Sequence, residues 1–130
     1  MKDEMLEAYG RQKLDEIRYW VYVLRCDGRF HADTYDELER KTRKRLGRVP
    51  AWLRPAWEHP RQAYIGQTEN LEKRLGEHFK NKRSSEFTEV FEPYAIEHLE
   101  PSTSRQGAER REKKIGESYY DNNRVFAYWK

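Results

Sequence analysis

The sequence predicts a small α/β or α+β domain, and two observations lead to that prediction. Short runs rich in β-branched and aromatic residues alternate with charged stretches that show helical spacing. In addition, the length of 130 residues is enough for one hydrophobic core and fits a single domain over 1–130. We therefore expect helices packed against one sheet.

The composition limits the kind of protein this can be. Charged residues make up 38% of the chain, but the 14% of aromatic residues argues against disorder. The net charge of +3 permits a polyanionic partner without requiring one. The single cysteine, Cys26, excludes an internal disulfide and a cysteine-based zinc site. No signal-like segment or membrane-length apolar run is present, so we expect a soluble, cytoplasmic protein without a membrane partner.

The first elements expected are a helix at 1–17 and a strand at 18–26. The helix has a loose apolar face. The strand, RYWVYVLRC, is apolar or aromatic at nearly every position, which is typical of a central strand covered on both sides. Residues 27–62 then interrupt the alternation of strands and helices and form an expected insertion.

The insertion begins with a helical stretch, ADTYDELERKTRKRLG, which Asp33 or Thr34 can cap and Gly47 can end. The segment after it contains evenly spaced prolines, which argue against a regular helix or a central strand. These prolines are Pro50, Pro55 and Pro60.

The second half of the chain alternates strand-like runs with helical stretches at short intervals. The expected elements are a strand at 63–68, a helix at 71–79, a polar loop at 81–87, a strand at 93–100, a helix from about Ser102 to Tyr119, and a last strand or aromatic tail at 124–129. This order again predicts a small sandwich of helices and one sheet.

Glu112 occupies an unusual position in the last expected helix. Ala108, Glu112, Ile115 and Tyr119 are spaced to lie on one face, so a carboxylate lies within the only apolar stripe of this helix. A carboxylate there is costly unless it is paired or holds a metal. One interpretation is a salt bridge to an arginine such as Arg111. The other is a magnesium site with one carboxylate, completed by water and substrate phosphate oxygens.

Arg74 and His78 are four residues apart at the edge of the apolar stripe of their helix. They are either solvated polar residues or an anion site, because a guanidinium matches phosphate and an imidazole can move a proton. Tyr22 and Tyr64 lie in the first two strands, where packing is the usual role. A phenol becomes a useful base if nearby positive charge lowers its pKa. Arg74, His78 and a metal on Glu112 would provide that charge.

The sequence resembles the GIY-YIG nucleases, and four segments in order carry the resemblance. These segments are WVYVL at 20–24, YIGQT at 64–68, NLEKRLGEH at 70–78 and AERREKKI at 108–115. The match covers about residues 18–126 and is similar to small single-domain members of the family. It implies a three-stranded antiparallel sheet flanked by helices, here with a helical insertion between the first two strands.

The resemblance also implies catalytic roles. Tyr22 would act as general base towards the attacking water, and His78 would assist its proton transfer. Tyr64 would position water or phosphate, and Arg74 would bind the scissile phosphate and stabilise its developing charge. Glu112 would hold the one divalent metal, Mg²⁺ or Mn²⁺. The family also has a late asparagine near the phosphate, for which the sequence offers Asn122 and Asn123; we favour Asn123.

Other residues are expected at the substrate. Gly66 would let the backbone and the neighbouring helix approach closely. The remaining expected substrate contacts are polar and basic residues near the second motif and in the insertion: Thr68, Lys80, Lys82, Arg83, Lys41, Arg43 and Lys44.

The chain departs from the family pattern in two places. The first motif reads Trp-Val-Tyr instead of Gly-Ile-Tyr, but it keeps Tyr22. The insertion at 27–62 far exceeds a hairpin loop of about 2–5 residues. Its helix has acids early and bases late, which suits the helix dipole, although the clustered bases would equally suit phosphate contacts. Trp52 and Trp57 are expected to pack the insertion onto the domain.

Together these observations predict a metal-dependent endonuclease that hydrolyses phosphodiester bonds in DNA, one strand per active site. RNA is not excluded as a substrate. The alternatives are a non-catalytic nucleic-acid-binding module on the same fold and a protein-interaction domain that uses the Trp/Pro segment. A homodimer or a protein partner bound through the insertion is also left open.

Overall fold

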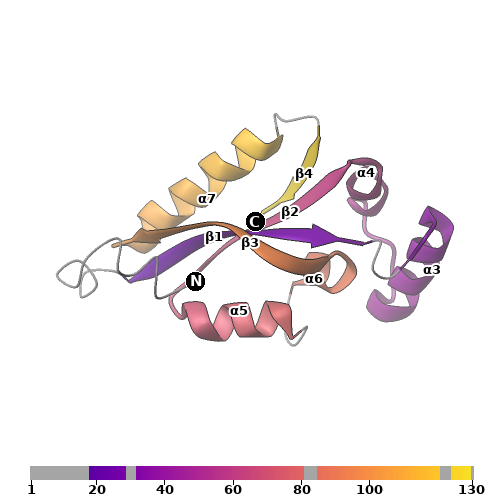
Figure 1. The fold of residues 1–130 in the computed structure, drawn as a ribbon, viewed down its shortest axis with the longest axis horizontal. Coiled ribbons are helices and arrows are strands. Elements are labelled where there is room, and N and C mark those ends of the chain that lie inside the picture. Colours follow the sequence, from indigo (N-terminus) through magenta and orange to yellow (C-terminus); the bar gives the residue numbers. More distant parts are fainter. Residues whose placement is uncertain (1–17, 29–31, 81–84, 121–123, 130) are drawn as a thin grey trace.

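The computed structural model describes residues 18–28, 32–80, 85–120 and 124–129. It consists of one sheet with helices on both faces (Figure 1). The elements are β1 (Tyr19–Asp27), α3 (Tyr35–Leu46), α4 (Leu53–Glu58), β2 (Arg61–Thr68), α5 (Leu71–Phe79), α6 (Glu86–Val90), β3 (Glu92–Ser102), α7 (Arg105–Tyr120) and β4 (Val125–Tyr128). The helix expected at 1–17 lies outside the described residues.

The sheet has the strand order β3-β1-β2-β4. β1 is central and pairs in antiparallel fashion with β2 on one side and β3 on the other. β4 then pairs with β2 in parallel. The α+β class and the antiparallel trio are therefore confirmed, and the segment expected at 124–129 forms a fourth strand instead of an aromatic tail.

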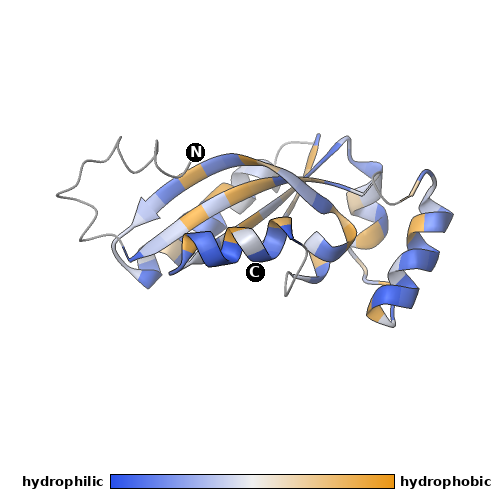
Figure 2. Cartoon of the chain, turned by 60° about the horizontal axis from the view of Figure 1, so that its bottom comes forward, coloured by the Kyte–Doolittle hydropathy of each residue, from blue (hydrophilic) through white to orange (hydrophobic). Residues whose placement is uncertain are grey.

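Alternation along β1 divides the core into two parts, because successive side chains of a strand point to opposite faces. Val21 and Val23 pack under α7 with Ala108 and Ile115. On the other face, Tyr22 and its neighbours pack with residues of α5, α6 and the insertion. Figure 2 shows hydrophobic residues recurring along the strands, whereas α3 is mostly hydrophilic. The prediction of a central strand covered on both sides is confirmed.

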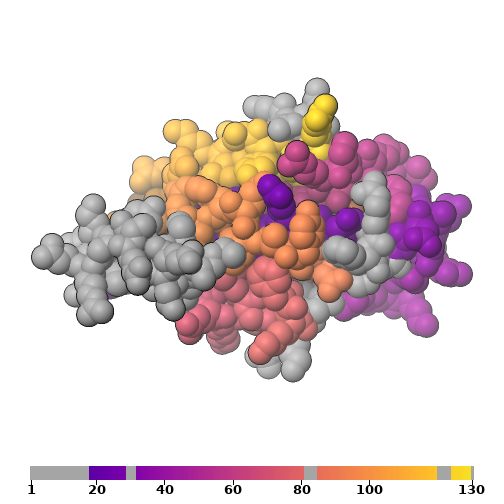
Figure 3. Space-filling view, in the orientation of Figure 1, coloured from indigo at the N-terminus to yellow at the C-terminus, as the bar shows by residue number. Residues whose placement is uncertain are grey.

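The insertion forms α3 and α4 at one end of the sheet (Figures 1 and 3). Thr34 caps α3 by accepting a hydrogen bond from the Glu37 backbone N–H, and Gly47 ends the helix with a left-handed φ of 77°. Both signals were predicted. The prediction that prolines preclude a helix was wrong, because α4 contains Pro55. Pro55 lies in the first turn, where a backbone N–H has no intrahelical acceptor to lose.

A second departure from the prediction is α6, which begins within the expected polar loop at 81–87. Ser85 caps it by accepting a hydrogen bond of 3.2 Å from the backbone N–H of Thr88. Phe87 and Thr88 are fully buried. A helix of five residues is too short to show an apolar period, so the serine cap was the local signal for it.

Trp52 fixes the insertion to the domain. Its ring centroid lies 5.2 Å from that of Phe87, 5.8 Å from Tyr128 and 6.2 Å from Phe91. This confirms that Trp52 packs the insertion onto the body of the protein. Within the part of the chain that the structure describes, no helix has the length and apolar character needed to cross a membrane.

We predict that Trp52→Ala lowers the free energy of unfolding by about 2–4 kcal/mol, because the half-buried indole supports three aromatic rings. Lys44→Ala on the exposed face of α3 is the control and should change it by less than about 0.5 kcal/mol. Urea unfolding followed by fluorescence measures both. Equal effects of the two substitutions would show that Trp52 does not anchor the insertion.

Candidate active site

A cavity of about 660 Å³ opens beside the edge of β2. β1 pairs with β2 as far as Thr68, whereas β4 pairs with it only from Arg61 to Tyr64. The outer edge of β2 beyond Tyr64 is therefore not covered by β4. Side chains from both faces of the sheet meet there. Among the residues predicted for the site, those that line the cavity are Tyr22, Tyr64, Gly66, Arg74 and Glu112.

Tyr22 lies at the centre of β1, directly opposite Gly66 of β2. Its side chain is 1% exposed. A Cβ atom on Gly66 would lie 2.5 Å from the Tyr22 hydroxyl oxygen, which is closer than real Cβ contacts. Gly66 was expected to permit a close approach of backbone and helix. In the structure, the group that approaches Gly66 closely is the phenol of Tyr22.

His78 reaches Tyr22 from α5, the helix that covers this face of the sheet. Asn70 begins that helix, accepting a hydrogen bond of 3.1 Å from the Lys73 backbone N–H. His78 Nε2 lies 2.9 Å from the Tyr22 hydroxyl oxygen, and the imidazole is 1% exposed. Its other nitrogen, Nδ1, lies 3.3 Å from the hydroxyl oxygen of Thr88. His78 therefore hydrogen-bonds on both sides within the core.

Burial sets the protonation states of this pair. It raises the pKa of Tyr22 well above its ordinary value; the nearby Tyr64 adds to this shift and Arg74 opposes it. Burial, with a smaller contribution from Arg74, lowers the pKa of His78 to about 4. Near neutral pH the phenol is protonated and the imidazole is neutral. The expectation that His78 supplies positive charge to Tyr22 was therefore wrong.

Glu112 enters the cavity from α7 and is 7% exposed. The neighbouring Arg111 donates hydrogen bonds of 2.7 and 2.9 Å to Glu100 of β3, and it does not line this cavity. Among the described residues, no group of three or more His, Cys, Asp or Glu side chains could hold a metal. Of the three glutamates that line the cavity, Glu109 and Glu117 are exposed and Glu112 is buried. One buried carboxylate facing open space fits Mg²⁺, which keeps several of its water ligands.

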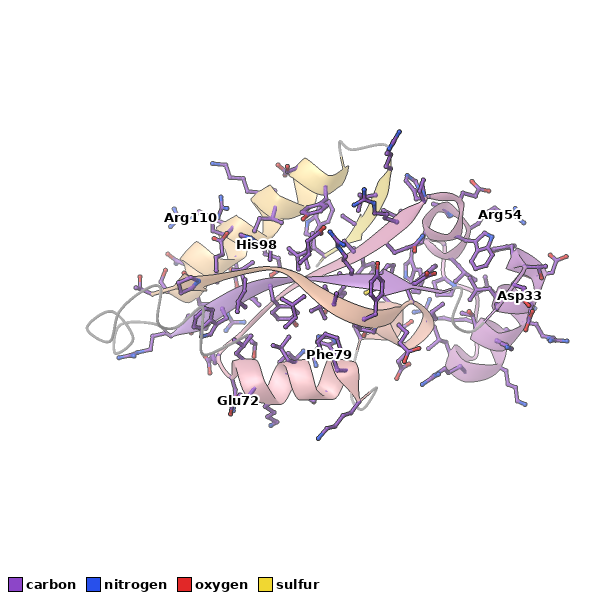
Figure 4. All side chains as sticks on the ribbon, in the orientation of Figure 1. Asp33, Arg54, Glu72, Phe79, His98 and Arg110 are labelled. Carbon is purple, nitrogen blue, oxygen red and sulfur yellow. The ribbon has the colours of Figure 1, made fainter. Side chains whose placement is uncertain are left out.

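Several predicted substrate contacts lie away from this cavity. Lys41 forms an ion pair of 2.9 Å with Glu37, and Arg43 forms one of 3.6 Å with Glu39. Figure 4 shows the insertion residues Asp33 and Arg54 at the opposite end of the molecule from Arg110 of α7.

The other expected contacts divide into two groups. Thr68 lines a smaller neighbouring cavity, and neither Lys44 nor Lys80 lines the main one. The remaining expected residues lie outside the described part of the chain: Lys82, Arg83, Asn122 and Asn123.

The sequence interpretation missed a row of charged residues on α7 that lines the cavity. Its members recur every fourth position and alternate in sign: Arg105, Glu109, Lys113 and Glu117. This spacing, next to the stripe that contains Glu112, was the available signal. Gln67 and Trp129 also line the cavity. Gly116 allows Trp129 to lie against α7, since a Cβ there would be 2.4 Å from the indole ring.

We predict that Gly66→Ala lowers the free energy of unfolding by about 1–3 kcal/mol, because the added methyl group displaces the buried Tyr22 phenol. Gly76→Ala is the matched control. It lies within α5 with open space around its Cβ position, so it should leave stability unchanged or raise it by about 1 kcal/mol. Denaturant unfolding measures both, and a harmless Gly66→Ala would contradict the packing described for Tyr22.

We also predict a stability change with pH that depends on His78. The unfolded chain takes up a proton on this residue near pH 6.5, whereas the folded protein does so only near pH 4. Its contribution is complete above pH 6.5 and is lost progressively as the pH falls to 4, by about 3 kcal/mol. Unfolding free energies of wild type and His78→Gln should therefore converge or cross in this window. Parallel curves would show that His78 titrates normally in the folded state.

Comparison with known proteins identifies the family of this chain. The family model for the GIY-YIG catalytic domain matches residues 56–124, which is more than half of the chain. No curated protein and no solved structure gives a match. The matched range contains Tyr64, Arg74, His78 and Glu112, whereas Tyr22 lies before it. The chain therefore belongs to the GIY-YIG family of nucleases.

Proposed function

We propose that the protein is a metal-dependent endonuclease that hydrolyses phosphodiester bonds in DNA, one strand at a time, in the cavity beside β2. One observation carries this proposal. Tyr22, Tyr64, Arg74 and Glu112 come from four different elements and line the same cavity. Hydrolysis of a phosphodiester needs a base to activate water, positive charge to neutralise the phosphate, and a metal. A tyrosine, an arginine and a carboxylate around one open space can meet these needs.

Tyr22 and His78 would together remove a proton from the attacking water. Because burial disfavours a phenolate, the two proton transfers are best made together. The water gives a proton to the Tyr22 oxygen while the Tyr22 hydroxyl proton passes to His78 Nε2. The phenol is regenerated in the same step, the imidazole carries the proton, and the water oxygen attacks the phosphorus.

Arg74 and Glu112 would act on the phosphate. The guanidinium of Arg74 presents several donors suited to phosphate oxygens and would stabilise the charge that develops on them. Tyr64 would orient the water or the phosphate from the adjacent wall of the cavity. Glu112 would hold Mg²⁺ or Mn²⁺, which when bound polarises the phosphate and the leaving oxygen.

The structure favours an enzyme over the two alternatives. A non-catalytic nucleic-acid-binding module has no need to bring Tyr22, Arg74 and Glu112 to one cavity, yet all three line it. A protein-interaction domain would present its Trp/Pro segment to a partner, whereas Trp52 packs on rings of the same chain. A single site cuts one strand, so a double-strand break would require a dimer or two successive nicks.

We predict that Glu112→Gln lowers the rate of nicking of supercoiled plasmid DNA in Mg²⁺ by on the order of 100-fold or more, because the amide is a poor ligand for a hard cation. Glu58→Gln, on the exposed surface of α4, is the control and should cut at the wild-type rate. Agarose gel electrophoresis of the relaxed product measures both. Wild-type cleavage by a correctly folded Glu112→Gln protein would overturn the metal assignment.

If instead the wild-type protein binds DNA but cuts neither plasmid, flap, branched nor RNA substrates with Mg²⁺ or Mn²⁺, the binding-module alternative is favoured. Steep salt dependence of that binding would then identify phosphate contacts as its source.

A further inference from the structure

We propose that Thr88 is a positioning residue: its hydroxyl holds His78 in the tautomer with the proton on Nδ1, so that Nε2 faces Tyr22 as an acceptor. Thr88 lies on α6 and belongs to none of the family segments recognised in the sequence. The structural part of this inference stands on hydrogen-bond geometry. Its catalytic part rests on the function proposed above.

The surroundings of Thr88 determine where its single hydroxyl proton goes. The side chain is fully buried, and its oxygen lies 3.1 Å from the carbonyl oxygen of Ser85 and 3.3 Å from His78 Nδ1. In the hydrogen bond between these two oxygens the Thr88 hydroxyl is the donor, because a carbonyl oxygen can only accept. The same carbonyl also accepts the Glu89 backbone N–H at 3.0 Å, as the helix requires. The lone pairs of the Thr88 oxygen are then left to accept a hydrogen bond from His78.

The position of Thr88 is itself fixed by the local helix cap. The Ser85 side-chain oxygen accepts a hydrogen bond of 3.2 Å from the Thr88 backbone N–H, and it lies 3.1 Å from the Thr88 hydroxyl. Phe87 beside it is buried among the aromatic rings of this face. The hydroxyl is therefore held by the cap and the core, which is the condition for orienting a neighbouring imidazole.

The consequence for His78 follows from the chemistry of a neutral imidazole, in which one nitrogen donates and the other accepts. If Nδ1–H donates to Thr88, Nε2 accepts the Tyr22 hydroxyl proton at 2.9 Å. In the opposite tautomer the Nε2–H would point at the Tyr22 oxygen. The Tyr22 hydroxyl proton could then no longer be accepted by His78 Nε2. The same bond also stabilises the imidazolium that forms when His78 takes the proton, because Nδ1–H still donates to Thr88.

The first test measures the tautomer and needs neither DNA nor metal. In protein labelled with ¹⁵N-histidine, the ¹⁵N shifts of His78 should show a protonated Nδ1 and an unprotonated Nε2. Thr88→Val removes the hydroxyl at similar volume and should move His78 towards the Nε2-protonated form, whereas Thr88→Ser should keep the wild-type shifts. Thr42→Val, at a buried threonine of α3, is the matched control and should also keep them.

Either of two results would overturn the proposal: an Nε2-protonated His78 in wild type, or unchanged shifts in a folded Thr88→Val protein. If Thr88→Val does not fold, the wild-type and Thr88→Ser spectra still decide the question, because both must show the Nδ1 proton.

The second test measures single-turnover nicking. Thr88→Val should slow cleavage by about 10- to 100-fold at unchanged DNA affinity, and Thr88→Ser should restore most of the rate. Equal rates for Thr88→Val and Thr42→Val would overturn the catalytic part. A wild-type protein that never cuts DNA would refute the proposed function while leaving the tautomer measurement intact, so the two failures are distinguishable.

Discussion

The hydrogen bond between Tyr22 and His78 is the interaction on which the candidate site depends. It joins the central strand to α5 between two side chains that are each 1% exposed, at the inner wall of the cavity. Three features of the fold make it possible. Gly66 leaves room for the phenol, α5 covers that face of the sheet, and α6 places Thr88 against the far nitrogen of the imidazole. The burial that this requires raises the pKa of Tyr22 and lowers that of His78, so both groups are neutral near neutral pH.

The insertion packs against the aromatic residues that surround the Tyr22–His78 pair. Trp52 contacts Phe87, which stacks at a centroid distance of 6.4 Å on Tyr64 and of 4.9 Å on Tyr128. Tyr64 in turn lies 5.0 Å from the ring of His78. A continuous set of aromatic contacts thus runs from the insertion to the site, and it excludes water from one side of the Tyr–His pair. Through this packing the insertion contributes to the core next to the site. The basic residues of α3 extend away from it, and two of them are held by acids one turn earlier.

Local patterns predicted most of the fold. The central strand, the bounds of α5 and both ends of α3 follow from apolar spacing and capping residues, because these signals act over a few positions. The prediction that Pro55 prevents a helix failed, because a proline is tolerated in the first turn of a helix, where Pro55 lies. The parallel pairing of β4 with β2 is a contact between distant segments, which no local pattern reports. Tyr22, Arg74 and Glu112 could be selected by resemblance, yet the neutral state of His78 could not, since it follows from burial that only the fold determines. The charged row on α7 can be seen in the sequence as a four-residue repeat. The cavity that this row lines could not be predicted, because it forms between segments that are distant in the sequence.

The most direct measurement of whether this cavity is a nuclease site is anomalous X-ray diffraction from crystals of Tyr22→Phe grown with Mn²⁺ and a DNA duplex. Removing the Tyr22 hydroxyl should leave binding intact while preventing cleavage. We expect an anomalous peak for Mn²⁺ at the Glu112 carboxylate, with a DNA phosphate in the cavity next to Arg74. Mn²⁺ bound elsewhere, with the DNA backbone outside this cavity, would contradict the assignment of the site.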